Sequence, residues 1–161
     1  MLTLLEKVLA LKAVAMFVGT PDEVLTEIAS ILVEERYAAG ASVFAKGDLG
    51  SSMYIIARGR LRAHDGERTL NELRERAVFG EMAMLDPAPR VASVTALEDT
   101  LLLRIDTHPF YELLANRAEV AHGIIRILAG YVRDRVDDIS TLDARLREAA
   151  HLSDSVDTFI T

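Results

Sequence analysis

The sequence predicts a mainly β protein with flanking helices, in which an antiparallel sandwich or barrel lies between helical N-terminal and C-terminal segments. Glycines at positions 40, 47, 50, 59, 66 and 80 separate short segments rich in β-branched and aromatic residues. Both ends of the chain instead repeat apolar residues at helical spacing. Short strands with regularly spaced glycine turns favour an antiparallel sheet that closes on itself and so leaves few edges.

Two helices are expected in the N-terminal segment, residues 1–34. Residues 2–16 repeat leucine and valine at helical spacing. Thr20-Pro21-Asp22-Glu23 is a good helix start, with Thr20 as the cap, proline at the first helical position and early acidic residues. We expect this second helix to run to about Val33 and to bury Val24, Leu25, Ile28 and Leu32.

Residues 35–106 are expected to form the barrel. Leu101-Leu102-Leu103 would also suit the core of a helix, but Thr100 before it and the turn-like residues 106–109 after it favour a strand. The other expected strands are Ser42–Phe44, Met53–Ile56 and Val91–Ala96.

The helical period returns in residues 107–150. We expect a short helix from Phe110 to about Ala115 and a long one from about Ala118 to Ala150, followed by a polar tail, residues 151–161, that frays. The second half of the long helix repeats apolar residues every three or four positions, which suits pairing with a second chain. Homodimerisation is therefore left open, on a seam formed by Val132, Val136, Ile139, Leu142, Leu146 and Ala149.

Composition excludes several classes of function. The 161 residues include no cysteine, so disulfides, thiolate metal sites and cysteine nucleophiles are absent, and the four histidines are scattered without metal-ligand spacing. A net charge of −7 argues against a nucleic-acid partner. No apolar run approaches the length of a membrane span and no signal peptide is recognisable, so we expect a cytoplasmic protein with no membrane contact.

The most informative stretch, residues 79–93, places Glu81 and Arg90 at the two ends of a loop rich in turns and small residues. A guanidinium holds two anionic oxygens at once, and a carboxylate accepts from donors such as sugar hydroxyls. Gly80 allows close approach of the backbone to a ligand. Together these residues describe a pocket for a small sugar phosphate.

The sequence of residues 79–94, FGEMAMLDPAPRVASV, resembles the phosphate-binding cassette of cyclic nucleotide-binding domains, and we take residues 79–93 as the cassette. Residues 39–44, 46–50, 53–59 and 97–100 also resemble strands and turns of that family, so the resemblance covers the chain from about residue 4 to about residue 140. It implies a double-stranded β-helix (jelly-roll) barrel with N-terminal helices and a long C-terminal helix. The chain looks like a bacterial cAMP-binding regulatory domain without a DNA-binding domain.

In that family the glutamate accepts from the ribose 2′-hydroxyl and the arginine pairs with the cyclic phosphate. The resemblance carries these roles to Glu81 and Arg90, with nearby backbone N–H groups as further donors. The alternative for these two residues is an ordinary surface ion pair. The resemblance implies a ligand site made of Gly80, Glu81, Met82, Ala83, Arg90, Val91, Ala92 and Ser93.

Two features of the ligand site are less specific. A hydroxyl after the arginine bonds to guanine in the family, whereas Val91 offers no donor, so cyclic AMP is favoured over cyclic GMP. For Ser93, a ligand contact and a bond to backbone remain equally open. The family's long helix closes over the base, which makes Ile127 and Tyr131 candidates for a base lid; packing against the barrel is the simpler alternative for both.

The sequence departs from the family just before the Phe-Gly-Glu motif. The family has glycines there, whereas residues 71–78 contain none. We therefore expect Arg74, Glu75 and Arg76 to rebuild the turn, with a different local geometry.

These observations predict a non-enzymatic regulatory sensor that binds cyclic AMP as a ligand, requires no cofactor or metal, and transmits binding through movement of its C-terminal helix. An enzyme of the similar-looking metal-binding barrel class would need several histidines in the barrel, whereas residues 35–106 contain only His64. The alternative is a module of a larger protein that keeps the fold but binds no ligand and serves interaction or dimerisation.

Overall fold

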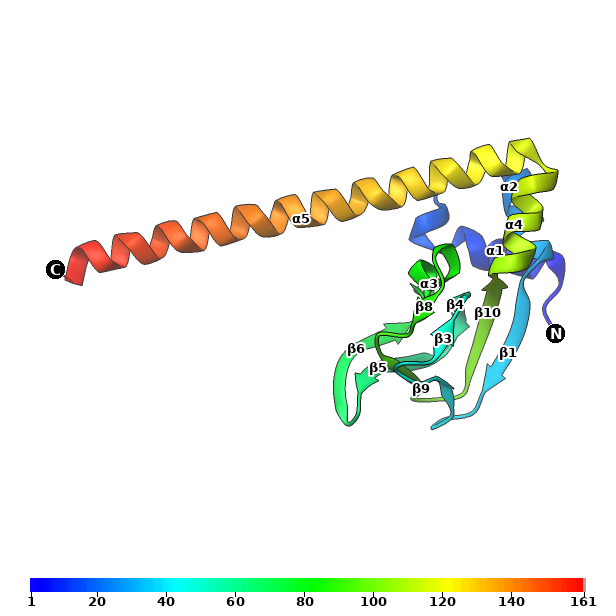
Figure 1. Ribbon diagram of the computed structural model, residues 1–161, viewed down its shortest axis with the longest axis horizontal. Helices are drawn as coiled ribbons and strands as arrows, with labels where there is room; N and C mark the ends of the chain where they lie inside the picture. Colours follow the sequence, from blue (N-terminus) through cyan, green and yellow to red (C-terminus); the bar gives the residue numbers. More distant parts are fainter. Residues whose placement is uncertain (161) are drawn as a thin grey trace. The chain divides into compact units, whose positions relative to one another are not determined.

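The structure is a computed structural model that describes residues 1–160, except for the side chains of Met82, Leu85, Tyr131 and residues 152–160. The chain divides into two units (Figure 1). The first, Met1–Ile124, contains all of the strands, and the second begins at Ile125 within the last helix. Each unit is described by itself.

The first unit contains two four-stranded antiparallel sheets, which confirms the predicted sandwich. One sheet has the order β1 (Val33–Tyr37), β10 (Thr100–Asp106), β4 (Ser52–Arg58), β7 (Val78–Phe79). The other has the order β2 (Ser42–Phe44), β9 (Ser93–Ala96), β5 (Arg60–Asp65), β6 (Arg68–Arg74). A small third sheet pairs β3 (Leu49–Gly50) with β8 (Ala88–Pro89).

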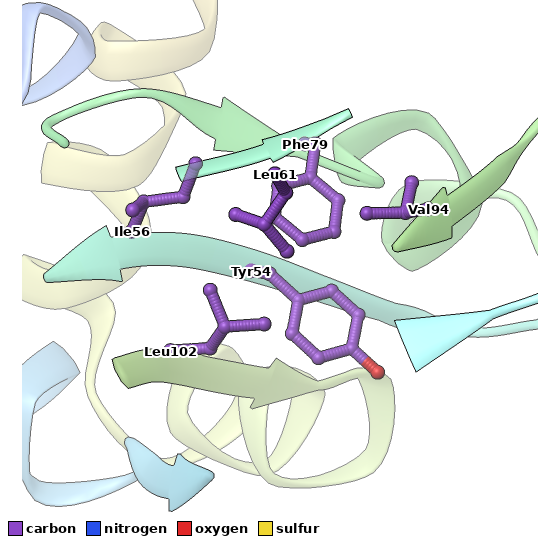
Figure 2. Close-up of a cluster of buried hydrophobic side chains, with 6 residues drawn as sticks. All are labelled: Tyr54, Ile56, Leu61, Phe79, Val94 and Leu102. Atoms are coloured by element: carbon purple, nitrogen blue, oxygen red, sulfur yellow. The ribbon is translucent and has the colours of Figure 1, made fainter. Parts of the chain in front are cut away.

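The core of the barrel lies between the two large sheets (Figure 2). One sheet contributes Tyr54, Ile56, Phe79 and Leu102, and the other contributes Leu61 and Val94. The rings of Tyr54 and Phe79 stack, with their centroids 5.0 Å apart. Because alternate residues of a strand face opposite sides, these positions define the inner face.

Strands β4 and β10 are buried on both faces. On the outer face Met53, Ile55, Leu103 and Ile105 are as inaccessible as the residues of the inner core. This two-sided burial explains why residues 101–103 form a continuous apolar run, and it confirms that they belong to a strand.

The N-terminal helices are shorter than expected. Helix α1 (Leu4–Lys12) begins at the cap Thr3, whose hydroxyl accepts from the Glu6 N–H at 3.1 Å, and a 3₁₀ turn, η1 (Ala15–Phe17), follows. Helix α2 (Asp22–Ser30) is capped by Pro21 without a side-chain hydrogen bond, so the expected cap at Thr20 is wrong. It ends before Val33, which opens β1 instead. The expected burial of Val24, Leu25, Ile28 and Leu32 is confirmed.

The C-terminal segment begins with α4 (Thr107–Asn116), three residues earlier than expected. Pro109 lies in the first turn, where its missing N–H is not needed. Helix α5 (Ala118–Ile160) then starts beside α2: Arg117 pairs with Glu27 at 2.6 Å, and a Cβ on Gly123 would lie 2.8 Å from Val24 Cγ2. Gly123 is therefore required for the close approach of these two helices.

In the second unit α5 continues past Ala150, where we expected it to end, to Ile160, so residues 151–160 are helical rather than a frayed tail. The side chains of the predicted dimerisation seam are more than half exposed along this helix at Val132, Val136, Ile139, Leu142 and Leu146.

The turn before the cassette is rebuilt without glycine. Arg76 has a φ of +72°, a left-handed conformation that side chains with a Cβ rarely adopt. Two backbone hydrogen bonds hold it: Arg76 N–H donates to the Ile56 carbonyl at 3.0 Å and Ala77 N–H donates to the Arg74 carbonyl at 3.1 Å. The absence of glycine therefore leaves the turn in place at the cost of a strained arginine.

Replacing this arginine by glycine should stabilise the protein. A left-handed residue with a Cβ costs roughly 1–2 kcal/mol of strain, which glycine removes. Part of this gain is offset because glycine loses more conformational entropy on folding. We expect Arg76→Gly to raise the free energy of unfolding by about 0.5–1 kcal/mol in urea denaturation. Arg74→Gly, in strand β6, is the control and should lower it. If Arg76→Gly instead lowers the free energy of unfolding, the inference that Arg76 is strained is wrong.

Candidate functional site

Near the start of the cassette, Gly80 links β7 to the short helix α3 (Glu81–Leu85). Its φ is +77°, and a Cβ there would lie 2.7 Å from Arg90 Nη1 and 2.8 Å from the Ser52 carbonyl oxygen. Conformation and lack of space both require glycine at this point.

Toward the end of the cassette, the backbone of Arg90 is hydrogen-bonded to the loop that precedes β3. Arg90 N–H donates to the Asp48 carbonyl at 2.7 Å, and Gly47 N–H donates to the Arg90 carbonyl at 2.8 Å. A Cβ on Gly50 would lie 2.1 Å from Arg90 Nε. Two glycines, Gly50 and Gly80, therefore leave the space that the arginine side chain occupies.

The guanidinium of Arg90 is buried, with only 7% of the residue exposed. Nη2 donates to the Ser52 carbonyl at 2.9 Å, and Cζ lies 4.2 Å from the centroid of the Phe44 ring. Nη1 is itself buried and finds no acceptor among the described residues. Burial lowers the pKa of Arg90, and the nearby Tyr54 and Asp48 oppose that shift. Since an arginine in a protein keeps its proton, the site holds a buried cation with one donor unsatisfied.

A cavity of about 460 Å³ lies at the cassette, and both Glu81 and Arg90 line it. The fold thus brings to one cavity the two side chains that the sequence places nine positions apart. Five strands supply an apolar wall. The residues of that wall are Phe44, Ala63, Leu73, Phe79 and Val94.

Most of the predicted ligand residues line this cavity: Gly80, Glu81, Ala83, Arg90, Val91 and Ala92. Ser93 is not among the lining residues; its hydroxyl accepts from the Lys46 N–H at 2.9 Å, which is the backbone role left open above. The side chain of Met82 lies outside the described residues. The roles of these residues toward a ligand remain predictions.

The predicted base lid belongs to the second unit. Ile127 lies beyond Ile124, where the first unit ends, and the side chain of Tyr131 lies outside the described residues. Their part in covering a ligand therefore also remains a prediction.

Three contributors to the site were missed from the sequence. Phe44 was recognised only as a strand residue, although its spacing on β2 would have placed it inside the barrel. Gly50 was noted only as a turn glycine and within the resemblance to the family. The carbonyl of Ser52 carries no sequence signal, because any residue has one.

A polar network joins the site to the start of α4. The Ser52 carbonyl accepts from Arg90, while the Ser52 hydroxyl donates to Asp106 Oδ1 at 2.6 Å. Arg104 donates to the same carboxylate, with Nε 2.8 Å from Oδ1. The Thr107 hydroxyl, one residue on, lies 3.0 Å from the Met84 carbonyl at the end of α3. The cavity, α3 and the first turn of α4 thus share one junction.

Asp106 is held in its charged form by this junction. Burial alone would raise its pKa, but the hydrogen bonds from Ser52 and Arg104 and the charge of Arg104 bring the pKa below its ordinary value.

Among the side chains that the structure describes, no group of three or more His, Cys, Asp or Glu is arranged to hold a metal ion. Within residues 1–160, no helix combines the length and the apolar character that crossing a membrane requires.

Comparison with known proteins finds the same fold and a related sequence. Residues 34–117 match the family described as cyclic nucleotide-binding domain. The chain is 35% identical over 147 residues to the cyclic AMP receptor protein of Thermus thermophilus, which covers 86% of this chain and 68% of that protein. It is 28% identical over 131 residues to a CRP-like cAMP-activated global transcriptional regulator of Mycobacterium tuberculosis, covering 78% of this chain and 58% of that regulator.

A solved structure supports the fold independently. The N-terminal domain of a transcriptional regulator from Streptomyces coelicolor superimposes with a TM-score of 0.72 and 28% identity, covering 80% of this chain and 95% of that one. The barrel with its N-terminal helices and long C-terminal helix is therefore the expected jelly roll.

The Asp106 junction should make stability depend on pH. Because the folded-state pKa of Asp106 is depressed, its contribution is complete above the unfolded-state pKa of about 4 and is lost as pH falls through the folded value. We expect Asp106→Asn to lower the free energy of unfolding by about 1–2 kcal/mol at pH 7, and the difference from wild type to shrink below about pH 4.

The matched control is Asp65→Asn, which removes an exposed pair with Lys46 and should change stability by under about 0.5 kcal/mol. Urea denaturation at several pH values measures both variants. A difference for Asp106→Asn that stays constant across the pH range would rule out the titration.

Proposed function

The chain belongs to the cyclic nucleotide-binding domain family, and on that basis we propose that it is a sensor of cyclic AMP whose C-terminal helices respond to binding. The observation that carries the proposal is the buried Arg90, whose Nη1 lacks an acceptor in a cavity that Glu81 also lines. A regulatory role without catalysis accords with the relatives, whose names describe receptors and regulators.

The cavity suits a cyclic nucleotide in chemistry and size. The phosphodiester carries a single negative charge, which one guanidinium neutralises. In the proposed complex Nη1 donates to a phosphate oxygen, Glu81 accepts from the ribose 2′-hydroxyl, and the apolar wall faces the purine. A volume of about 460 Å³ falls within the usual range of small-molecule sites.

Cyclic AMP is proposed over cyclic GMP because the residue after the arginine offers no hydroxyl. Val91 is 88% exposed and lines the cavity, so a polar side chain at this position would reach a ligand.

We propose that the junction formed by Ser52, Asp106 and Thr107 links the site to the C-terminal helices. An anion that engages Arg90 changes the forces on the Ser52 carbonyl, and the same residue holds Asp106 immediately before α4. A ligand shifts such an equilibrium only by its differential affinity for the two states. Movement of the C-terminal helix and a base lid at Ile127 and Tyr131 are parts of this proposal.

A second candidate function is that of an interaction module without a ligand. The exposed apolar seam of α5 favours it, because the seam suits pairing with a second copy of the chain. The two roles are compatible in a homodimeric sensor.

The chain spans 68% and 58% of the lengths of the two relatives named above, so their whole-protein activities are not transferred to it. We propose a cytoplasmic location and no direct contact with nucleic acid or membrane.

Removing the arginine tests the function. We expect Arg90→Ala to lower the affinity for cyclic AMP at least about 30-fold in calorimetry, since a charge-assisted hydrogen bond is worth about 1.5–3 kcal/mol and the ion attraction adds to it. The control is Arg68→Ala on β6, which is exposed and outside the cavity lining, and it should bind like wild type. If wild-type protein shows no binding of cyclic AMP, the ligand-free module becomes the better interpretation.

Adding a hydroxyl beside the arginine tests the choice of base. We expect Val91→Thr to increase affinity for cyclic GMP relative to cyclic AMP by roughly 3- to 10-fold, since one new hydrogen bond contributes about 0.5–1.5 kcal/mol. Val91→Ala, which adds no donor, controls for the loss of volume. An unchanged ratio in Val91→Thr would mean that the base is selected elsewhere in the cavity.

A further inference from the structure

We propose that Phe44 is a positioning residue: its ring fixes the plane of the Arg90 guanidinium and thereby holds Nη1 toward the ligand. The inference rests on the proposed function only in naming the ligand. Its structural basis is the distance of 4.2 Å between Arg90 Cζ and the Phe44 ring centroid, well inside the range of a cation–π contact.

Arg90 needs such a support because few hydrogen bonds hold its side chain. Among the residues that the structure describes, the guanidinium hydrogen-bonds to the Ser52 carbonyl, which accepts from Nη2. Gly50 and Gly80 leave room for the side chain but offer it no attraction. One hydrogen bond restrains one edge of the fork, and Nη1 on the other edge has no polar partner among the described residues.

The ring of Phe44 supplies the missing restraint without using a donor. A carboxylate in the same place would take up N–H groups and neutralise the charge. An aromatic face attracts the cation through its quadrupole and leaves Nη1 and the positive charge available to an anion. This accounts for a guanidinium that is 7% exposed, lines the cavity and keeps a buried Nη1 without an acceptor.

Phe44 is itself held in place by two other rings. Its centroid lies 6.1 Å from that of Tyr54 and 6.0 Å from that of Phe79, with tilts of 47° and 54°. Tyr54 and Phe79 stack on each other, and both rings lie in the core drawn in Figure 2, so the aromatic support continues into the centre of the barrel. Tyr54 lies farther from Arg90, at 6.0 Å, and is the weaker contact.

The alternative is that Phe44 only contributes apolar surface to the wall of the cavity. Two substitutions separate the alternatives: Phe44→Leu keeps an apolar side chain but removes the ring, and Phe44→Tyr keeps the ring. If Phe44→Leu does not fold, Phe44→Met takes its place, because methionine fills irregular apolar space.

The first measurement uses ligand-free protein. NMR of the Arg90 Nε–H group reports the ring-current shift and the rotation of the guanidinium about the Nε–Cζ bond. We expect wild type and Phe44→Tyr to show an upfield-shifted signal and slow rotation, and Phe44→Leu to lose the shift and rotate faster. Unchanged signals in Phe44→Leu overturn the proposal, whatever its effect on binding.

The second measurement is the affinity for cyclic AMP by calorimetry. We expect Phe44→Leu to weaken binding roughly 3- to 20-fold, the span of a buried cation–π contact, and Phe44→Tyr to restore it. Equal affinities of wild type and Phe44→Leu overturn the proposed effect on the ligand. If wild type itself does not bind cyclic AMP, the proposed function fails, while the NMR comparison still decides the role of Phe44.

Discussion

The site depends on one constraint: a positively charged guanidinium is buried in the barrel with a donor left unsatisfied. Burying a charge is unfavourable unless the surroundings compensate for lost hydration. At Arg90 the compensation comes from the Ser52 carbonyl and the Phe44 ring. Neither group neutralises the cation, and in the proposed complex it is the anionic ligand that does so.

The surrounding backbone follows from the space this side chain needs. Gly50 lies on β3 and Gly80 lies just before α3, and a Cβ at either position would collide with the guanidinium. The backbone of Arg90 donates a hydrogen bond to Asp48 and accepts one from Gly47, which ties the cassette to the start of β3. A pre-formed site of this kind loses little conformational entropy when it binds a ligand.

Ser52 gives the site a mechanical connection to the rest of the first unit. Its carbonyl faces Arg90 and its hydroxyl faces Asp106, at the end of a strand buried on both faces. The helix that follows begins beside the carbonyl of Met84, so α3 and α4 meet at the same place. Changes at the cavity therefore have a short polar route to the C-terminal segment, through groups with discrete hydrogen-bonding partners.

The sequence by itself determined the barrel, the long C-terminal helix, and the convergence of Glu81 and Arg90 on one cavity, because glycine turns, side-chain periods and a compact motif are local signals. Tertiary structure decided the rest. Val33 pairs with β10, so α2 ends earlier than its apolar period predicts. The Ser93 hydroxyl accepts a hydrogen bond from the Lys46 N–H, and Arg76 adopts a left-handed conformation in a turn without glycine. Phe44 and the Ser52 carbonyl acquire their roles only through contacts between residues 38 to 46 positions apart. Local patterns do not encode such contacts, since they form only when the two sheets close around the arginine.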